Sequence, residues 1–310
     1  MERYPGKISI LIPVFNNQNV LVELHKRLIQ VLPQVCDTYE IVLVDDGSKD
    51  DSWAEIEKLK KINEHIVGIK LMRNFGQQNA IAAGLEHVSG NVVVLMDADL
   101  QDRPEDILKL MDALFANDVS MAIAQWKSRK DGFFKLFASR LFYTISNRIT
   151  KIKLQPNLAV FRAFRKEVLV ELNKYQEKTS SVLSLLYWIG IDFTTVELER
   201  DERYSGKSGY NLKKMIKVAM DRIFSFSLVP IRLAIYAGLI TSIISFLFGV
   251  VLIVRYFVGL VPPGWTSIVV LILLFFGVNL IFLGIIGEYV GRIFWESRRR
   301  PKFIIKKILR

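Results

Sequence analysis

The sequence predicts an α/β domain, in which a mostly parallel sheet is flanked by helices, followed by two membrane-crossing helices. Three observations support this fold class. Apolar runs alternate with helical patterns in the first part of the chain, two of these runs end in paired carboxylates, and two long stretches near the C-terminus carry no charge. Strands that alternate with helices form parallel sheets with right-handed crossovers.

The elements of the α/β domain follow one another in strict alternation. We expect strands over residues 8–15 (stopped at Pro13), 40–46, 66–71, 91–96 and 121–125, and helices over 20–32, 52–63, 79–88 and 105–114. Short, β-branched apolar runs between turn residues are typical of strands, and amphipathic stretches with polar caps are typical of helices.

The valine-rich run 91–96 ends in two carboxylates, Asp97 and Asp99. A continuous apolar run of this length indicates a strand buried on both faces, and ligands of open α/β sheets bind at the carboxyl ends of such strands. Two anions this close favour a cation, and Mg²⁺ or Mn²⁺ bridging a diphosphate is the natural candidate. The alternative is an acidic turn in which Asp102 and Pro104 merely start the next helix.

A second carboxylate pair, Asp45 and Asp46, ends the strand 40–46. Parallel strands place both pairs at one edge of the sheet, where one could hold a base or ribose and the other a metal-bound diphosphate. The chain has no Gly-x-Gly-x-x-Gly after its first strand and no Gly-x4-Gly-Lys-[Ser/Thr]. Dinucleotide-binding and P-loop folds are therefore disfavoured.

The composition of the chain indicates the compartment in which the protein works. The chain has 310 residues, a net charge of +11, a hydrophobic share of 51% and one cysteine, Cys36. A single cysteine forms no internal disulfide, which favours a reducing compartment. The polar start 1–7 leads into a strand, so no signal peptide is expected.

Two stretches without charge, 233–254 and 267–287, predict a transmembrane hairpin. At ~1.5 Å per residue the first would span ~33 Å, enough for a bilayer core of ~30 Å. Lysine and arginine crowd both outer flanks, whereas the connection carries only Arg255, so both ends of the chain are expected in the cytoplasm. Anionic lipid then explains much of the positive charge, and no nucleic-acid partner is expected. Small residues in these stretches, the glycines at 238, 249, 277 and 284, could support helix packing between protomers of a homo-oligomer.

Two basic segments, 132–152 and 211–225, alternate apolar residues with lysine and arginine. Both fit interfacial helices at an anionic membrane surface, although the first also fits a core-facing helix with a solvated side. The polar loop 199–210 carries Arg203, Lys207 and Ser208, which could close over phosphates; a simple solvated loop is the alternative.

Five motifs stand out along the chain: Pro13–Asn16, Val44–Ser48, Arg73–Gln77, Asp97–Gln101 and Gly287–Arg292. Together they resemble the polyprenyl-phosphate glycosyltransferases, membrane-associated inverting enzymes of the GT-A fold related to dolichol-phosphate mannose synthase. The resemblance covers nearly the whole chain, and the bacterial two-helix branch acting on undecaprenyl phosphate is the most similar. The last motif, which follows the second apolar stretch, is the most specific of the five.

The resemblance implies roles for individual residues. Donor phosphates and a Mg²⁺ or Mn²⁺ ion would lie at Asp97 and Asp99, with Gln101 completing the metal shell and Arg203 acting with the two aspartates in catalysis. The nucleotide-sugar would contact the following residues: Pro13, Phe15, Val44, Asp45, Asp46, Asp97, Ala98, Arg140, Lys207 and Ser208.

The resemblance also implies the domain organisation and substrates. Residues 1–210 would form the cytoplasmic GT-A domain, 211–232 an interfacial helix, 233–287 the hairpin and 288–310 a basic cytoplasmic tail, in a bacterial inner-membrane protein. One sugar would pass from a nucleotide-sugar, with uridine diphosphate expected by analogy, to a polyprenyl phosphate. A processive polysaccharide synthase is one rival because it shares this sheet, although it normally has more membrane helices and a Gln-x-x-Arg-Trp motif that is absent here. A degenerate membrane scaffold is the other rival, because the stretch 155–160 lacks the carboxylate that the family usually has there.

Overall fold

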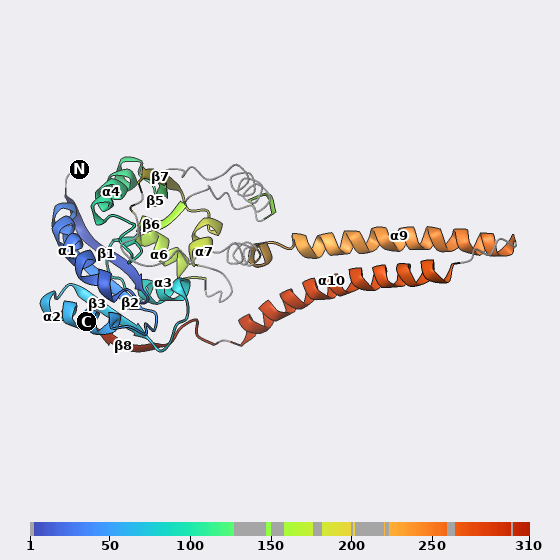
Figure 1. Cartoon of the computed structure of the whole chain (residues 1–310). Helices are drawn as coiled ribbons and strands as arrows, with labels where there is room; N and C mark the ends of the chain where they lie inside the picture. The colour runs from blue at the N-terminus through green and yellow to red at the C-terminus, as the bar shows by residue number, and fades with distance from the viewer. Residues whose placement is uncertain are drawn as a thin grey trace. The chain divides into compact units, whose positions relative to one another are not determined.

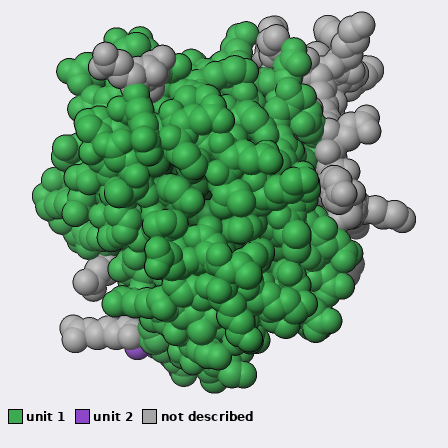
Figure 2. All heavy atoms as spheres, turned by 90° about the vertical axis from the view of Figure 1, so that its left-hand side faces the viewer, with its two compact units in different colours: residues 1–212, 300–310 green, residues 213–299 purple. Residues whose placement is uncertain are grey.

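The computed structural model describes residues 3–126, 147–149, 158–175, 182–199, 201, 220, 223–258, 264–298 and 300–310. The chain divides into two compact units, which Figure 2 colours separately. Unit 1 comprises Met1–Leu212 and Arg300–Arg310, and unit 2 comprises Lys213–Arg299. The end of the chain therefore belongs to the same unit as its beginning.

Unit 1 is built on one mixed, mostly parallel sheet (Figure 1). Its strand order is β7-β5-β6-β4-β1-β2-β3-β8. Neighbours β1–β2, β1–β4, β2–β3 and β5–β7 are parallel, while β6 runs antiparallel to β4 and β5, and β8 antiparallel to β3. The strands are β1 (Tyr4–Val14), β2 (Cys36–Asp45), β3 (Ile66–Leu71), β4 (Val92–Leu95), β5 (Met121–Trp126), β6 (Leu158–Arg165), β7 (Phe193–Leu198) and β8 (Ile305–Leu309).

Helices cover the sheet because its central strands are apolar on both sides. The core cluster takes alternate residues of β1, Ile8, Ile10 and Ile12, whereas Leu11 is buried on the side of α3. Helix α1 packs against both α2 and α4, and α3 packs against α7, which also contacts α6. The helices are α1 (Gln18–Val35), α2 (Ser52–Ile62), α3 (Gln77–Leu85), the 3-10 turn η1 (Pro104–Asp106), α4 (Ile107–Ala116), α6 (Lys166–Leu172) and α7 (Val182–Trp188).

Strand β1 lies at the point where the order of the sheet reverses. The chain passes from β1 to β2 and β3 on one side, and then returns through α3 to β4 on the other side of β1. Ligands of open α/β sheets bind beside the carboxyl ends of the strands at such a switch point. The fold therefore directs attention to the residues that follow β1, β2 and β4.

The structure differs from the expected strands and tail at four points. Strand β1 continues through Pro13, which pairs with Val44, and β2 begins at Cys36 rather than at residue 40. The segment 158–165 forms an antiparallel strand between β4 and β5 that the sequence pattern did not reveal. The basic segment 288–310 is not simply a tail, because it contains the end of a long helix and the edge strand β8.

Unit 2 contains two long apolar helices, α9 (Val229–Phe257) and α10 (Trp265–Ser297). Their segments Val229–Val251 and Leu274–Ser297 have mean hydropathies of 2.2 and 1.8, and both are long and apolar enough to cross a membrane. These helices extend beyond the expected bounds 233–254 and 267–287. Most of the two expected interfacial helices, 132–152 and 211–225, lies outside the described residues.

The motif at Gly287–Arg292 links α10 to the segment that precedes α9. The Tyr289 hydroxyl donates a 2.6 Å hydrogen bond to the Ser227 carbonyl, and the Arg292 guanidinium donates to the Ser225 hydroxyl at 2.9 Å. Arg292 also forms an ion pair with Glu288 at 2.8 Å. This motif thus has a structural function within unit 2.

Candidate active site at the carboxyl edge of the sheet

The loops that follow β1 and β2 are joined by hydrogen bonds. The backbone N–H of Asn16 donates to the Ser48 hydroxyl at 3.0 Å, and the Lys49 N–H donates to the Asn16 side-chain oxygen at 2.9 Å. Phe15, at the start of this loop, is 42% exposed, which is unusual for a large aromatic side chain. An exposed ring beside a switch point offers a stacking surface for a planar base.

Asp45 and Asp46 at the end of β2 are both buried, and they differ in their partners. One oxygen of Asp45 accepts a 3.1 Å hydrogen bond from the Ser48 N–H, while its Oδ2 atom is buried without a hydrogen-bond partner among the described residues. Asp46 accepts from the backbone N–H groups of Phe75 at 2.7 Å and Gly76 at 2.9 Å. Asp46 therefore holds the 73–77 loop in place, which the sequence did not predict.

Burial raises the pKa of the Asp46 carboxyl group above its ordinary value. The two backbone hydrogen bonds and the Arg73 guanidinium act in the opposite direction, and the neighbouring Asp45 adds to the increase. A buried carboxylate beside a second one is costly in the absence of donors, so the Phe75 and Gly76 N–H groups are needed to stabilise it.

Gly47 allows the loop after β2 to approach the 73–77 loop closely. Its φ is +66°, and a Cβ atom there would lie 2.4 Å from the carbonyl carbon of Arg73. Any side chain at this position would meet backbone rather than a flexible group, which explains the glycine in Asp-Asp-Gly-Ser. The Arg73 guanidinium in turn lies over the Phe75 ring, 4.2 Å from its centroid.

The chain turns sharply after β4, and this turn carries the second carboxylate pair. Leu100 adopts a φ of +58°, which is uncommon for a residue with a side chain. One oxygen of Asp102 accepts a 3.0 Å hydrogen bond from the Asp97 N–H, and one oxygen of Asp99 accepts from the Gln101 N–H at 3.2 Å. Strain of this kind concentrates at functional sites.

The alternative interpretation, in which Asp102 and Pro104 merely start the next helix, is correct only for Pro104. Pro104 does occupy the first turn of the 3-10 segment η1, as a helix-starting proline should. Neither η1 nor α4 has a hydrogen bond from a side-chain cap, and the Asp102 carboxylate accepts its hydrogen bond from the Asp97 N–H. Asp102 thus shapes the turn that presents Asp97 and Asp99.

Gln77 connects the two carboxylate pairs. Its Nε2 atom donates a 2.6 Å hydrogen bond to Oδ1 of Asp97, and it directly follows Gly76, whose N–H is held by Asp46. The carboxyl ends of β2 and β4 are therefore linked through the start of α3. The sequence pattern places Gln77 in the motif Arg73–Gln77 but does not predict its contact with Asp97.

Asp201 joins the turn after β4 from a distant part of the chain. The Asp201 N–H donates to the Gln101 carbonyl at 3.4 Å, and Gln101 Nε2 donates to the Asp201 carbonyl at 3.3 Å. The Asp201 carboxylate forms a two-point ion pair with the Arg103 guanidinium, one contact being 2.7 Å from Nε. Asp201 is two residues before Arg203 in the sequence.

The predicted residues divide into two groups. The structure gathers Pro13, Phe15, Val44, Asp45, Asp46, Asp97, Ala98, Asp99 and Gln101 on the ends of adjacent strands, whereas Arg140, Arg203, Lys207 and Ser208 lie outside the described residues. Within the described part of the chain, no three His, Cys, Asp or Glu side chains cluster as a complete metal site. Two carboxylates and an amide oxygen fit Mg²⁺ or Mn²⁺, which usually keep water and substrate phosphate oxygens as further ligands.

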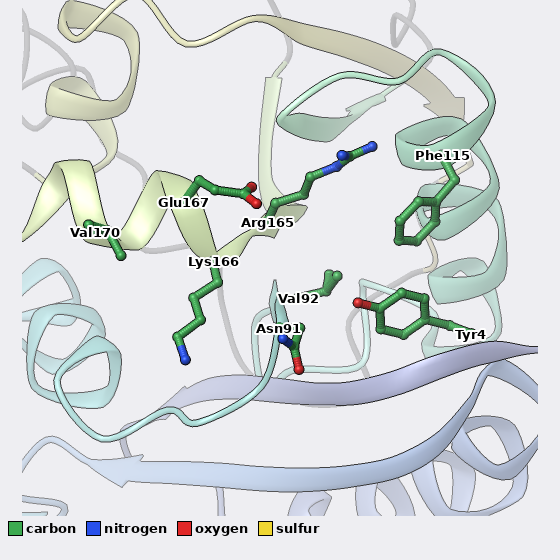
Figure 3. A pocket seen from close by; sticks show the side chains of 8 residues that line it. All are labelled: Tyr4, Asn91, Val92, Phe115, Arg165, Lys166, Glu167 and Val170. Atoms are coloured by element: carbon green, nitrogen blue, oxygen red, sulfur yellow. The ribbon is translucent and has the colours of Figure 1, made fainter.

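A hollow of about 330 Å³ lies at the opposite ends of β1 and β4, away from these carboxylates. Figure 3 shows Tyr4 and Phe115 on one side of it and Lys166, Glu167 and Val170 on the other. The Tyr4 and Phe115 rings are stacked 5.0 Å apart, and Asp118 pairs with Arg165 at 2.7 Å. Side chains of both charges line or border the hollow, so it does not favour a ligand of either charge. None of the predicted site residues lines it.

The fold has known structural relatives. The mannosyltransferase PcManGT from Pyrobaculum calidifontis, solved in complex with GDP-Man and Mn²⁺, matches with a TM-score of 0.51 and 18% identity. The match covers 72% of this chain and 64% of that chain, so it spans less than two thirds of the mannosyltransferase. Together with the sheet order and the carboxylates at the switch point, this match defines a GT-A fold.

Sequence relatives extend over nearly the full length. The Bacillus subtilis protein called uncharacterized glycosyltransferase YkcC is 39% identical over 96% of this chain and 93% of its own. The bactoprenol glucosyl transferase of Shigella phage SfV is 37% identical over 97% of this chain and 98% of its own. Residues 9–172 match the model of glycosyl transferase family 2, and the chain belongs to this family of glycosyltransferases.

Proposed function

We propose that the protein transfers one sugar from a nucleotide-sugar to a polyprenyl phosphate at the cytoplasmic face of the bacterial inner membrane. The product would be a polyprenyl-phosphate-sugar for modification of a cell-envelope glycan. The main supporting observation is the linkage of both carboxylate pairs at one sheet edge, from Asp46 through Gly76 and Gln77 to Asp97, in a chain with two long apolar helices. The alignment with a bactoprenol glucosyl transferase over 97% of this chain and 98% of that protein supports the lipid acceptor.

The nucleotide end of the donor would lie at the carboxyl ends of β1 and β2. The exposed Phe15 ring is a stacking surface, and Asp45 Oδ2 is a buried acceptor that lacks a donor among the described residues. A base with a ring N–H would supply such a donor, which makes the acceptor favourable rather than costly. Uracil and guanine both carry this group, and uridine diphosphate is the expected donor by analogy with the bacterial branch.

The diphosphate would lie at the carboxyl end of β4. Asp97, Asp99 and Gln101 would hold a Mg²⁺ or Mn²⁺ ion there, and such an ion supplies Lewis-acid stabilisation of the charge on a departing diphosphate. Gln77 and Asp102 keep the Asp97 side chain and backbone in place for this role. Arg203, Lys207 and Arg140 would contribute positive charge to the phosphates.

The acceptor chemistry removes the need for a strong base. A phosphate monoester has a second pKa of ~6, so the lipid phosphate is already largely a dianion at neutral pH and can attack the anomeric carbon directly. One displacement would form the bond from phosphate oxygen to sugar and break the bond to the nucleoside diphosphate, which inverts the anomeric carbon. A family-typical carboxylate missing from 155–160 is compatible with this reaction.

The positively charged flanks of the apolar helices support a cytoplasmic location for unit 1. The segment after Leu274–Ser297 carries Arg298, Arg299, Arg300 and Lys302, while the stretch 252–273 between the two apolar segments carries only Arg255, in the last turn of α9. Positive residues near the ends of membrane helices favour the cytoplasmic side. Nucleotide-sugars would then meet the site on the side of the membrane where they are made.

The test is transfer by the full-length protein in detergent, with undecaprenyl phosphate and a panel of UDP- and GDP-sugars, followed by mass spectrometry of the lipid. We expect a mass increase of one sugar, from one nucleotide-sugar, only with Mg²⁺ or Mn²⁺ present. A polymer on the lipid would instead support the processive synthase. Absence of turnover of every nucleotide-sugar would support the scaffold and contradict the proposal.

A further inference from the structure

We propose that Asp201, held by Arg103, is a positioning residue that fixes which end of the Gln101 side-chain amide is presented for metal binding. The inference rests on the proposed function, because it concerns the metal site of that reaction. It assigns a task to an ion pair that lies outside every motif discussed above.

The orientation of the Gln101 side-chain amide decides which of its atoms can bind a metal ion. An amide side chain has a donor end and an acceptor end, and only the oxygen is a ligand for Mg²⁺ or Mn²⁺. Gln101 Nε2 donates to the Asp201 carbonyl at 3.3 Å. With its nitrogen committed to Asp201, the side chain presents its oxygen in the other direction, and a flipped amide would place two carbonyl oxygens against each other.

Asp201 is held in place against Gln101 by several contacts with the loop that follows β4. Gln101 is only 4% exposed, so its orientation depends on protein contacts rather than on water. Asp201 is held by the Gln101 backbone through its N–H and by Arg103 through its carboxylate. Since Arg103 is two residues after Gln101, the loop that follows β4 contacts Asp201 with backbone, amide and guanidinium groups.

The electrostatics agree with a firm contact. The pKa of the Asp201 carboxyl group is lowered below its ordinary value, and the hydrogen bond from the Arg103 guanidinium is the largest cause. Two-point arginine–carboxylate pairs are geometrically specific, which suits a positioning role better than a single-point contact would. Partners of metal ligands typically change metal affinity by about 10–100-fold when removed.

The chain contains a matched control. Arg27 on α1 forms the same kind of two-point pair with Glu105, at 2.9 and 2.5 Å. Glu105 belongs to η1, on the same loop. The Arg27 charge helps to lower the pKa of the Asp201 carboxyl group, but among the described residues the Arg27 guanidinium donates its hydrogen bonds to Glu105. Loss of Arg27 therefore removes a nearby positive charge and a local ion pair while the hydrogen bonds that hold Asp201 against the Gln101 amide remain.

The experiment measures Mn²⁺ affinity of the full-length protein in detergent, by the electron paramagnetic resonance signal of unbound Mn²⁺, without nucleotide and with UDP or GDP. We expect R103A and D201A to weaken Mn²⁺ binding by about 10–100-fold, D201E to restore it to within about threefold, and R27A to change it by less than about twofold. Thermal unfolding of each variant checks that it folds. D201N and R103K repeat the test if an alanine variant is unstable.

A double-mutant cycle with Gln101 separates positioning from general loosening. If Asp201 acts through the amide, R103A has little further effect in a Q101A background, because the group that it orients is gone. Equal losses in both backgrounds, an equal loss in R27A, or unchanged Mn²⁺ affinity in R103A and D201A would overturn the inference alone. A wild-type protein that binds no Mn²⁺ under any of these conditions would overturn the metal site of the proposed function as well.

Discussion

The side-chain amide of Gln77 donates a 2.6 Å hydrogen bond to the Asp97 carboxylate, which joins the first turn of α3 to the carboxyl end of β4. Gly76, immediately before it, is held by Asp46 at the end of β2. Two carboxylate pairs that begin 52 positions apart in the sequence, at Asp45 and Asp97, are thereby connected through one short loop. This link makes the loop between β3 and α3 part of the site.

Removal of the Gln77 amide should reduce transfer without unfolding the protein. We expect Gln77→Ala to lower the transfer rate by about 10–100-fold at saturating donor, because one Asp97 oxygen loses the donor that orients it. Gln77→Glu should be worse, since it places a second carboxylate against Asp97. Gln34→Ala, on an exposed part of α1, serves as the control. Wild-type rates in Gln77→Ala would show that the contact has no functional role.

Asp99 should be essential for metal-dependent transfer. We expect Asp99→Ala to lose at least about 100-fold in rate even with saturating Mn²⁺ or Mg²⁺, because the charge of the departing diphosphate loses its stabilisation. Asp112→Ala, on the exposed side of α4, removes a carboxylate elsewhere and should retain activity. Full transfer by Asp99→Ala at saturating metal would refute the metal assignment.

The strand ends were predictable because they follow from local patterns and one topological rule. A continuous apolar run predicted β4, and parallel pairing of β1 with both β2 and β4 places their carboxyl ends at one edge. The hydrophobic pattern thus located Asp45 and Asp97 without any tertiary information. The positive φ of Leu100 and the bond from Asp102 to Asp97 have no such local signature.

Contacts between distant segments could not be predicted in this way. Gln101 and Asp201 are 100 positions apart, and nothing in either local pattern indicates the other. Strand β8 was hidden because Lys306 and Lys307 suggested a basic tail, whereas the Lys307 ammonium pairs with Glu57 at 2.8 Å and the strand adds to β3. The positive charge of this segment favoured a lipid-facing interpretation, whereas in the structure the segment forms an edge strand of the sheet.

The stability of unit 1 should depend on a buried carboxylate away from the active site. Burial would raise the pKa of Glu40, but hydrogen bonds from Lys7, Ser9 and Ser89 outweigh it, and the pKa is lowered overall. Ser9 donates to Glu40 at 2.5 Å, and the Ser89 N–H donates at 2.6 Å. A lowered pKa means that this contribution is present above the pKa of the unfolded state, ~4.3, and is lost as the pH falls through the folded-state value.

The expected result for Glu40→Gln is a loss of about 1–3 kcal/mol in the free energy of unfolding at pH 7, because donors are left poorly matched. Denaturant unfolding of the full-length protein in detergent, followed by tryptophan fluorescence, measures it. The difference from wild type should shrink as the pH falls below ~4.3. Glu64→Gln, at an exposed position, should change little. A difference that is independent of pH would show that the charge of Glu40 is not what stabilises the fold.

The membrane topology can be tested with introduced cysteines, because the native Cys36 is buried and burial raises the pKa of its thiol to about 11. Thiols react as thiolates, so Cys36 gives little background near neutral pH. In whole cells, Gly264→Cys at the start of α10 should react with a membrane-impermeant maleimide. Glu64→Cys on unit 1 should react only after the inner membrane is permeabilised. Gly264 has a φ of −162°, which any residue adopts, so the substitution should be tolerated. Labelling of Glu64→Cys in intact cells would place unit 1 outside the cytoplasm, where nucleotide-sugars are not made, and would contradict the proposed reaction.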